Sequence, residues 1–158
     1  MHLEDQIYPK RAHYFKDYRE HTVSLEEFVD KIRWAKTAGG DEVVVIAMIE
    51  TKEGLANLDA ICATPGLDAV YIGPADLSFA LGLPPRADNP DPLHMEACDR
   101  IRDAAHKAGI KACMHCASAA FAAGAIKRGF DLVMLTADIA CMIAGAKKQL
   151  EDLKAATA

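Results

Sequence analysis

The stretch Val43–Ser78, VVVIAMIETKEGLANLDAICATPGLDAVYIGPADLS, contains two strand–loop–helix units in a row. Its first apolar run, Val43–Ile49, is unbroken, as expected of a parallel strand that is buried on both faces. Thr51 then caps a helix that carries leucine and isoleucine on one side. The second apolar run is Leu67–Ile72. Two such units in succession predict neighbouring parallel strands of an α/β fold.

An acidic residue follows each of these strands. Glu50 comes directly after the first strand, and Asp76 follows the second strand and the turn Gly73-Pro74-Ala75. The carboxyl ends of parallel strands form the face at which such folds bind ligands. One acid alone is as well explained by a helix cap or a solvated loop. Two carboxylates on neighbouring strands suit a hard divalent cation with open positions for substrate oxygens, so the pair predicts a metal site.

The alternation of strand and helix continues on both sides of this stretch. Strands are predicted near 43–49, 68–72, 110–115 and 130–135. A truncated strand ending at Glu4-Asp5 and a helix with a capping box of Ser24 and Glu27 precede them, and a helix at Ile139–Lys154 follows. A complete (β/α)8 barrel needs typically ~250 residues, so this chain holds about five of the eight units. We therefore expect one α/β domain, residues 1–158, with the architecture of a partial (β/α)8 TIM barrel.

A loop rich in Pro, Asp and Asn, Leu83–Pro92, separates the second and third of these strands from one another. Asp91 is predicted to cap the helix that follows the loop, with Pro92 at its first position. The apolar side of this helix is predicted from residues at helical spacing, namely Leu93, Ala97, Ile101, Ala104 and Ala108. On this assignment His94 and His106 are solvated.

Composition limits the class of protein. Hydrophobic residues make up 51% of the chain, so it can form a core, and the net charge of −5 without any Lys/Arg block argues against nucleic-acid binding. The apolar runs are far shorter than the ~20 residues of a membrane span. The sequence MHLEDQ lacks the features of a signal peptide. Five cysteines without a disulfide spacing predict reduced thiols and a cytoplasmic location.

The motifs M-I-E-T-K-E-G and P-G-L-D-A-V-Y-I-G-P-A-D-L-S resemble the HpcH/HpaI family of metal-dependent pyruvate aldolases, over about residues 41–154. The resemblance implies a (β/α)8 barrel of the phosphoenolpyruvate/pyruvate superfamily. It also implies that Glu50 and Asp76 bind Mg²⁺, Mn²⁺ or Co²⁺, and that the backbone around Gly73, Ala75 and Asp76 holds the carboxylate and keto oxygen of pyruvate. The expected function is a class II aldolase, a carbon–carbon lyase that cleaves or forms 4-hydroxy-2-oxo acids through a metal-stabilised enolate.

Residues 1–38 resemble a different family. The string H-L-E-D-Q-x-Y-P-K-R is similar to the isocitrate lyase and phosphoenolpyruvate mutase group, in which an acid at the position of Glu4 supports the metal. In that group the loop that carries Lys10 and Arg11 closes over the substrate. The lyases have Cys-Gly-His after Lys-Arg, whereas this chain has Ala12-His13-Tyr14. The chain is thus divided into a lyase-like segment, 1–40, and an aldolase-like segment, 41–158.

One further string, Cys113-Met114-His115-Cys116, contains residue types that can bind a metal or take part in catalysis. A structural zinc site needs four ligands, and no second pair stands at a suitable spacing. Along a strand Cys113 and His115 point to one side and Met114 to the other, at the carboxyl end where a pocket forms. His115 is therefore a candidate catalytic or substrate-contacting residue, with a structural histidine as the alternative.

Three functions remain open. The first is the aldolase, which acts on pyruvate or oxaloacetate and an aldehyde, and whose catalytic His and Arg come from early barrel units that nothing in Met1–Asp41 matches. The second is a lyase or mutase of the isocitrate lyase group. The third is a non-catalytic partial barrel that folds and oligomerises. An open barrel exposes sheet edges, and the aldolase family exchanges its last helix between subunits, so we expect a homo-oligomer.

Overall fold

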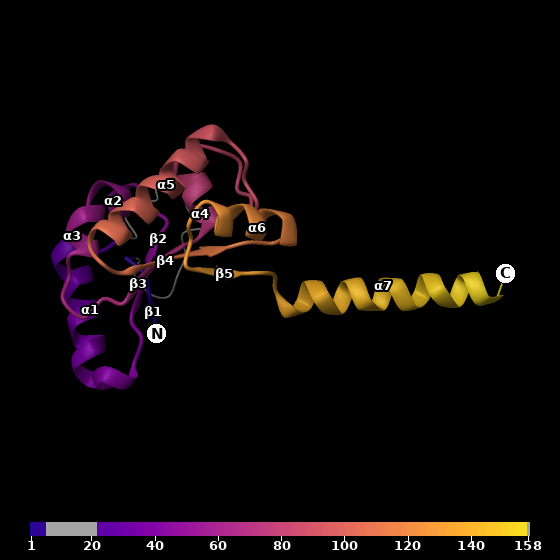
Figure 1. Cartoon of the computed structure of the whole chain (residues 1–158), viewed down its shortest axis with the longest axis horizontal. Coiled ribbons are helices and arrows are strands. Elements are labelled where there is room, and N and C mark those ends of the chain that lie inside the picture. Colours follow the sequence, from indigo (N-terminus) through magenta and orange to yellow (C-terminus); the bar gives the residue numbers. More distant parts are fainter. Residues whose placement is uncertain (6–21, 158) are drawn as a thin grey trace.

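A parallel sheet forms the centre of the molecule (Figure 1). The computed structural model describes residues 1–5 and 22–157. Five strands lie in the order β1-β2-β3-β4-β5, each parallel to the next. They are β1 His2–Leu3, β2 Ile46–Ile49, β3 Ala69–Ile72, β4 Lys111–His115 and β5 Leu132–Met134. This order confirms the predicted α/β fold and gives an open segment of a (β/α)8 barrel.

Helices connect the strands as predicted. They are α1 Leu25–Gly39, a 3-10 turn η3 Gly40–Glu42, α2 Lys52–Ala56, α3 Leu58–Cys62, α4 Pro74–Ala80, α5 Pro92–Lys107, α6 Ala119–Lys127 and α7 Asp138–Thr157. The predicted caps are confirmed. The side chains of Ser24, Thr51 and Asp91 accept a hydrogen bond from a backbone amide in the first turn of α1, α2 and α5, respectively. The strands begin later than predicted. The amide of Val45, for example, is bonded to the Asp68 side chain at 2.8 Å.

The two faces of the sheet are covered differently. Alternate strand residues such as Ala47, Val70 and Met114 join helix residues such as Ile32 and Ile101 in one large buried core. The intervening strand residues form a smaller cluster on the opposite face, made of Ala69, Tyr71 and Cys113 with Ile46 and Met48 packed against it. Helices therefore pack on one face of the sheet, and the other is its inner face. The predicted opposite orientations of Met114 and Cys113 are confirmed.

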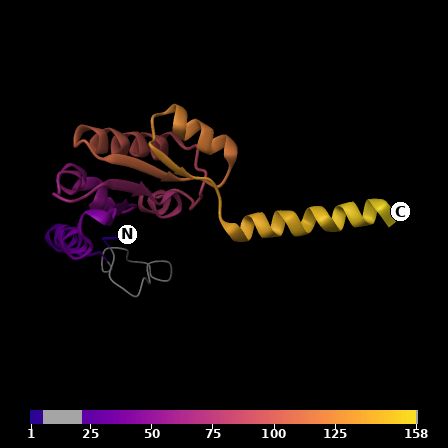
Figure 2. The ribbon, with the colours of Figure 1, turned by 60° about the horizontal axis from the view of Figure 1, so that its bottom comes forward.

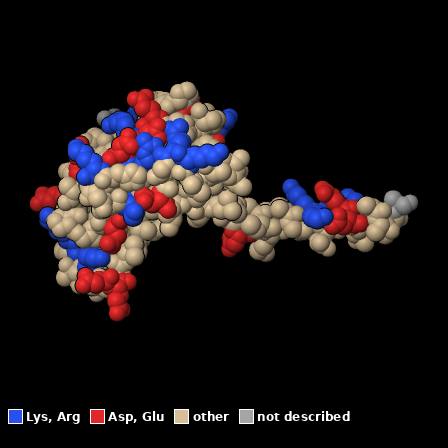
Figure 3. Space-filling model, viewed as in Figure 1, with Lys and Arg blue, Asp and Glu red and all other residues tan. Residues whose placement is uncertain are grey.

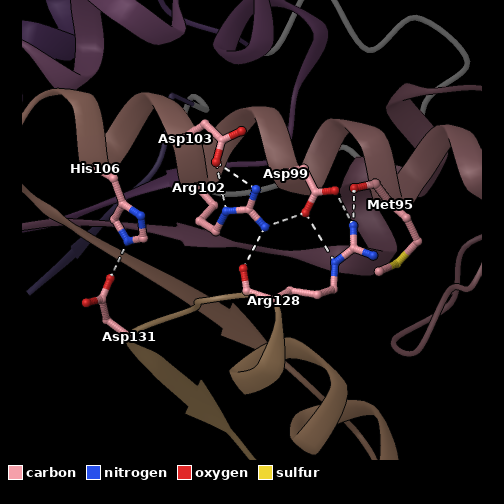
Figure 4. A network of polar contacts seen from close by, with 7 residues as sticks. All are labelled: Met95, Asp99, Arg102, Asp103, His106, Arg128 and Asp131. Carbon is pink, nitrogen blue, oxygen red and sulfur yellow. Dashed lines mark hydrogen bonds and ion pairs between the residues drawn. The ribbon is translucent and has the colours of Figure 1, made fainter.

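Ion pairs fasten the last strand–helix unit to α5 (Figure 4). Asp99 on α5 accepts hydrogen bonds from both Arg102 and Arg128, and Arg102 also donates to the Arg128 carbonyl at 2.7 Å. One turn further on, His106 of α5 contacts the carboxylate of Asp131 at 2.9 Å. The same carboxylate accepts from the Ala112 amide at 3.0 Å. Asp131 therefore ties the start of β5 to both α5 and β4.

The buried side of α5 differs from the prediction by about one residue position. His94 is fully buried, so its assignment to solvent was wrong, whereas Leu93 is 47% exposed. Spacing within the helix allows either residue to face inward. His94 faces inward because it contacts main-chain groups of Pro74 and Asn89, which precede the helix. The apolar spacing within the helix carries no information about these contacts.

The last helix, α7, runs away from the body of the molecule in both views (Figures 1 and 2). It has no buried residue, and its large apolar side chains are exposed, namely Ile139, Met142, Ile143, Leu150 and Leu153. Figure 3 shows both signs of charge interspersed over the body, while on α7 the basic residues lie in the half distant from the body and acidic residues lie at both its start and its distant half. None of the described helices is both long enough and apolar enough to cross a membrane.

Replacing Asp131 with Asn should lower the free energy of unfolding by about 1 kcal/mol at pH 7. The Ala112 amide, followed by Lys111, holds the pKa of Asp131 well below its usual range. A depressed folded pKa gives a stabilising contribution that is complete above the unfolded pKa, ~3.9, and is lost as the pH falls toward the folded pKa. Urea unfolding at several pH values should therefore show the difference between Asp131→Asn and the parent shrinking below about pH 4.

The control is Asp103→Asn, which removes an ion pair whose carboxylate is 67% exposed. This variant should match the parent closely at every pH, because exposed pairs contribute little. A loss of stability in Asp131→Asn that stays constant with pH would show that its ionised carboxylate is not what stabilises β5.

Candidate functional site

The candidate site lies at the carboxyl ends of β2, β3 and β4. Ile49 pairs with Ile72, and Ile72 pairs with Met114. The next residue of each strand is therefore level with the others: Glu50, Gly73 and His115. Alternation along the strands puts these three on the inner face, as continuations of the rows that contain Met48, Tyr71 and Cys113. Adjacent strands lie roughly 4.8 Å apart, so the Glu50 and His115 backbones are separated by about 10 Å.

The carboxylate of Glu50 lies against Gly73. Only 1% of Glu50 is exposed. A Cβ atom built on Gly73 would meet Glu50 Oε2 at 2.0 Å and Glu50 Cδ at 3.2 Å. Gly73 has an ordinary φ of −89°, so the glycine is needed for space and not for an unusual backbone conformation. Glu50 therefore reaches from β2 across to the end of β3.

Asp76 is placed in the first turn of α4 and is half-buried. The turn that the sequence predicted at Gly73-Pro74-Ala75 is wrong, because the helix begins within it. Gly73 is instead the N-terminal cap, Pro74 is the first helical residue, and the Leu77 amide bonds the Gly73 carbonyl at 2.9 Å. Proline suits this position because its fixed φ and missing N–H cost nothing there. The amides of Ala75 and Asp76 consequently lie in a turn that offers them no i−4 carbonyl.

The donor set fits a hard divalent cation. Glu50, directly after β2, and Asp76, in the first turn of α4, would supply carboxylate oxygens, and Mg²⁺ is usually held by one or two carboxylates together with water and substrate oxygens. Within residues 1–5 and 22–157 the side chains of His, Cys, Asp and Glu form no group of three or more that could hold a metal. A cation at this place would therefore depend on oxygens from solvent or substrate, as a catalytic metal does.

Two further acids stand at the end of β1. Asp5 is buried, and its carboxylate accepts the hydroxyl hydrogen bond of Thr51, which follows Glu50. Burial raises the pKa of Asp5, although the Thr51 bond opposes this shift. The Asp5 carbonyl also accepts the Val23 amide at 2.7 Å, so Asp5 joins the chain before α1 to the start of α2. Sequence reasoning missed this role, although Asp5 was visible at a strand end.

Glu4, which the isocitrate lyase resemblance linked to the metal, directly follows β1 and is partly buried. β1 pairs with β2, so Glu4 belongs to the strand beside that of Glu50. Lys10, Arg11 and His13, the other residues of that resemblance, lie outside the described residues.

His115 is the last residue of β4 and is half-buried. Its Nδ1 atom lies 3.2 Å from the hydroxyl of Tyr71, whose oxygen is also 3.6 Å from Met134 Sδ. Burial, followed by the charges of Cys116 and Cys113, raises the pKa of Tyr71 to about 12. Tyr71 therefore keeps its proton near neutral pH and donates it to Met134 Sδ, so that its oxygen can accept a hydrogen bond from Nδ1–H of His115 and leave Nε2 free. Sequence reasoning proposed His115 but missed Tyr71, which stands two residues before Gly73.

Comparison with known proteins gives a consistent result. The sequence profile of the HpcH/HpaI aldolase/citrate lyase family matches residues 16–144. A hydroxypyruvate/pyruvate aldolase of Rhizorhabdus wittichii is 39% identical over 115 residues, which is 73% of this chain and 46% of that protein. A 2-keto-3-deoxy-L-rhamnonate aldolase of Klebsiella pneumoniae is 39% identical over 87 residues, which is 51% of this chain and 33% of that protein.

Solved structures agree with the sequence matches. A HpcH/HpaI aldolase/citrate lyase family protein from Burkholderia cenocepacia superposes with a TM-score of 0.67 at 26% identity, over 78% of this chain and 48% of that one. An HpcH/HpaI aldolase from Desulfitobacterium hafniense gives 0.65 at 27% identity, over 91% and 57%. The chain spans about half the length of the relatives that it matches. The matched range, the sheet and the motifs at its strand ends lead to one conclusion: the chain belongs to the HpcH/HpaI aldolase/citrate lyase family.

Proposed function

We propose that the chain carries the metal- and pyruvate-binding part of a class II aldolase, which forms or cleaves the carbon–carbon bond of 4-hydroxy-2-oxo acids. The observation that carries this proposal is the position of the Glu50 carboxylate. It lies against Gly73, the residue that caps α4, and Asp76 is in the first turn of that helix. Glu50 and Asp76 would hold Mg²⁺, Mn²⁺ or Co²⁺. When bound, the cation supplies Lewis-acid stabilisation of the negative charge on the enolate oxygen.

The residues around Gly73 would orient the substrate. Amide groups at Ala75 and Asp76 would bind the carboxylate of pyruvate or oxaloacetate, and the absence of a side chain at Gly73 leaves the space that the Glu50 carboxylate occupies beside them. The names of two relatives, hydroxypyruvate/pyruvate aldolase and 2-keto-3-deoxy-L-rhamnonate aldolase, support a 2-oxo acid as the substrate, with an aldehyde as its partner in the condensation direction.

Proton transfer at the reacting carbon is assigned to His115. It lies on the inner face, level with Glu50, and Tyr71 fixes one of its ring nitrogens. A positioned base typically contributes ~10²–10⁴-fold to a rate. Since the chain spans about half the length of its relatives, we expect weak activity from this chain by itself.

A second, non-catalytic role is favoured by α7. All of its side chains are outside the core, and its apolar residues lie along one side at Ile139, Ile143, Leu150 and Leu153. Burial of such a stripe is what usually stabilises an isolated helix. We therefore propose that α7 packs on a second copy of the chain and makes it a homo-oligomer.

The isocitrate lyase type of reaction is not favoured by any contact of the described residues. Four buried thiols and one exposed thiol, all unpaired, support a reducing compartment such as the cytoplasm.

Asp76→Asn should weaken the binding of Mn²⁺ by at least about tenfold, because it removes one of two charged ligands while preserving side-chain size. Gly73→Ala should have a similar effect by displacing the Glu50 carboxylate. Titration calorimetry with Mn²⁺ measures both affinities, and thermal melting checks that Asp76→Asn remains folded.

The matched control for metal binding is Asp59→Asn, which removes an exposed carboxylate of α3 that pairs with Lys107. It should bind Mn²⁺ as the parent does. Equal affinity in the parent and in Asp76→Asn, or no binding by either, would mean that the metal site is not assembled in this chain.

His115→Ala should slow the exchange of pyruvate methyl protons for deuterium by about 10²-fold in the presence of Mg²⁺. This exchange, followed by proton NMR in D2O, reports enolate formation without any aldehyde. The control is His106→Gln, because His106 lies on α5 and contacts Asp131 instead of the inner face. An unchanged exchange rate in His115→Ala would remove His115 from the mechanism.

Sedimentation velocity at micromolar concentration should show an oligomer, and Ile143→Glu should convert it to a monomer. Placing a charge within the apolar stripe of α7 makes its burial against a partner costly. Lys148→Gln changes the net charge by the same amount on the same helix but alters a residue paired with Asp152, so it should remain oligomeric. A compact monomer in the parent chain would contradict the packing of α7 on a second copy.

A further inference from the structure

Three polar side chains are buried together beside α4. They are Ser78 on α4 itself, Asn89 in the following loop, and His94 in the first turn of α5, and all three are less than 5% exposed. Serine, asparagine and histidine are uncommon at such depth, and loops in particular run over protein surfaces. Their shared position therefore requires an explanation beyond the packing of the core.

Hydrogen bonds connect these side chains into one network. Ser78 Oγ donates to the Pro74 carbonyl at 2.6 Å. Asn89 Nδ2 donates to Ser78 Oγ at 2.9 Å, and Asn89 Oδ1 accepts the Asp91 amide at 3.0 Å. The network thus runs from the residue that caps α5 back to the first residue of α4.

His94 supports the same network from the side of α5. Burial lowers the pKa of His94, while hydrogen bonds with main-chain groups of Pro74 and Asn89 oppose that shift. Contacts that favour the protonated ring are contacts with acceptors, so these groups are carbonyl oxygens. Cys98 Sγ, one turn further along α5, lies 3.6 Å from His94 Nδ1. His94 is therefore enclosed by contacts that join the start of α4, the loop and α5.

α4 needs such support because it is short. It has seven residues, whereas isolated helices of fewer than about 12–15 residues are marginal in water. Gly82, with a φ of +80°, follows it, and Gly73 precedes it. The network holds α4 at Pro74 and Ser78, which stand two residues before and two residues after Asp76.

We propose that Ser78, Asn89 and His94 are positioning residues that fix the orientation of Asp76 toward Glu50. This inference rests on the proposed metal site and assigns to it a set of supporting groups that never touch the cation. Loss of the network should leave the sheet intact but let the first turn of α4 shift, and the precision of a two-carboxylate site would be lost with it.

The test compares His94→Leu, His94→Gln and Ile101→Ala. Leucine fills the site without hydrogen bonds, glutamine restores a donor, and Ile101 is a fully buried residue of the same helix outside the network. Calorimetry with Mn²⁺, thermal melting and hydrogen–deuterium exchange of the segment 74–81 are measured for each. We expect His94→Leu to bind Mn²⁺ about 10–100-fold more weakly and to exchange faster at 74–81. Glutamine should recover most of the affinity, and Ile101→Ala should melt earlier with unchanged affinity.

Ser78→Ala serves as a second variant that removes the link to Asn89 without a large change in volume, and it should weaken Mn²⁺ binding even if His94→Leu fails to fold. Parent-like affinity in His94→Leu or, where that variant is unfolded, in Ser78→Ala overturns the inference and leaves the proposed function standing. Equal loss of affinity in Ile101→Ala also overturns it, because general destabilisation then explains the effect. Absence of Mn²⁺ binding by the parent chain rejects the proposed metal site and this inference together.

Discussion

The contact between Glu50 and Gly73 sets the geometry of the whole strand-end region. A carboxylate that is almost completely buried occupies the space of a missing side chain on the next strand. This arrangement requires the register in which Ile49 lies beside Ile72, and it requires α4 to begin immediately after Gly73. Burying a carboxylate costs free energy unless its charge is met by partners or by a cation. Folding at this edge and the proposed binding of a cation would therefore involve the same side chain.

Sequence reasoning succeeded where the controlling interactions are local. The caps at Ser24, Thr51 and Asp91 each need only residues two or three positions further on, and all were identified correctly. The apolar runs around Ile49 and Ile72 gave the strands, because burial on both faces leaves a clear pattern. The same patterns could not predict where the strands begin. The Val45 amide, just before β2, donates to the side chain of Asp68, which is distant in the sequence, instead of to a neighbouring strand.

The errors occurred where distant segments decide the outcome. Gly73-Pro74 suggested a turn, yet proline is equally suited to open a helix, and the contacts of Ser78 and Asn89 stabilise the helical choice. His94 was assigned to solvent because the spacing within α5 could not reveal its contacts with main-chain groups of Pro74 and Asn89, which lie outside the helix. For the same reason neither Tyr71 nor Asp5 was recognised, since their partners, His115 and Thr51, are more than 40 residues away in the chain.

The exposure of α7 has a consequence for spectroscopy. Four of the five cysteines are buried, and burial raises the pKa of each of their thiols, to about 12 for Cys98. The fifth, Cys141, is exposed in the first turns of α7. Thiol reagents attack the accessible thiolate, so a maleimide fluorophore would be directed to α7 without any engineered cysteine. Its depolarisation would then report how freely this helix tumbles relative to the body.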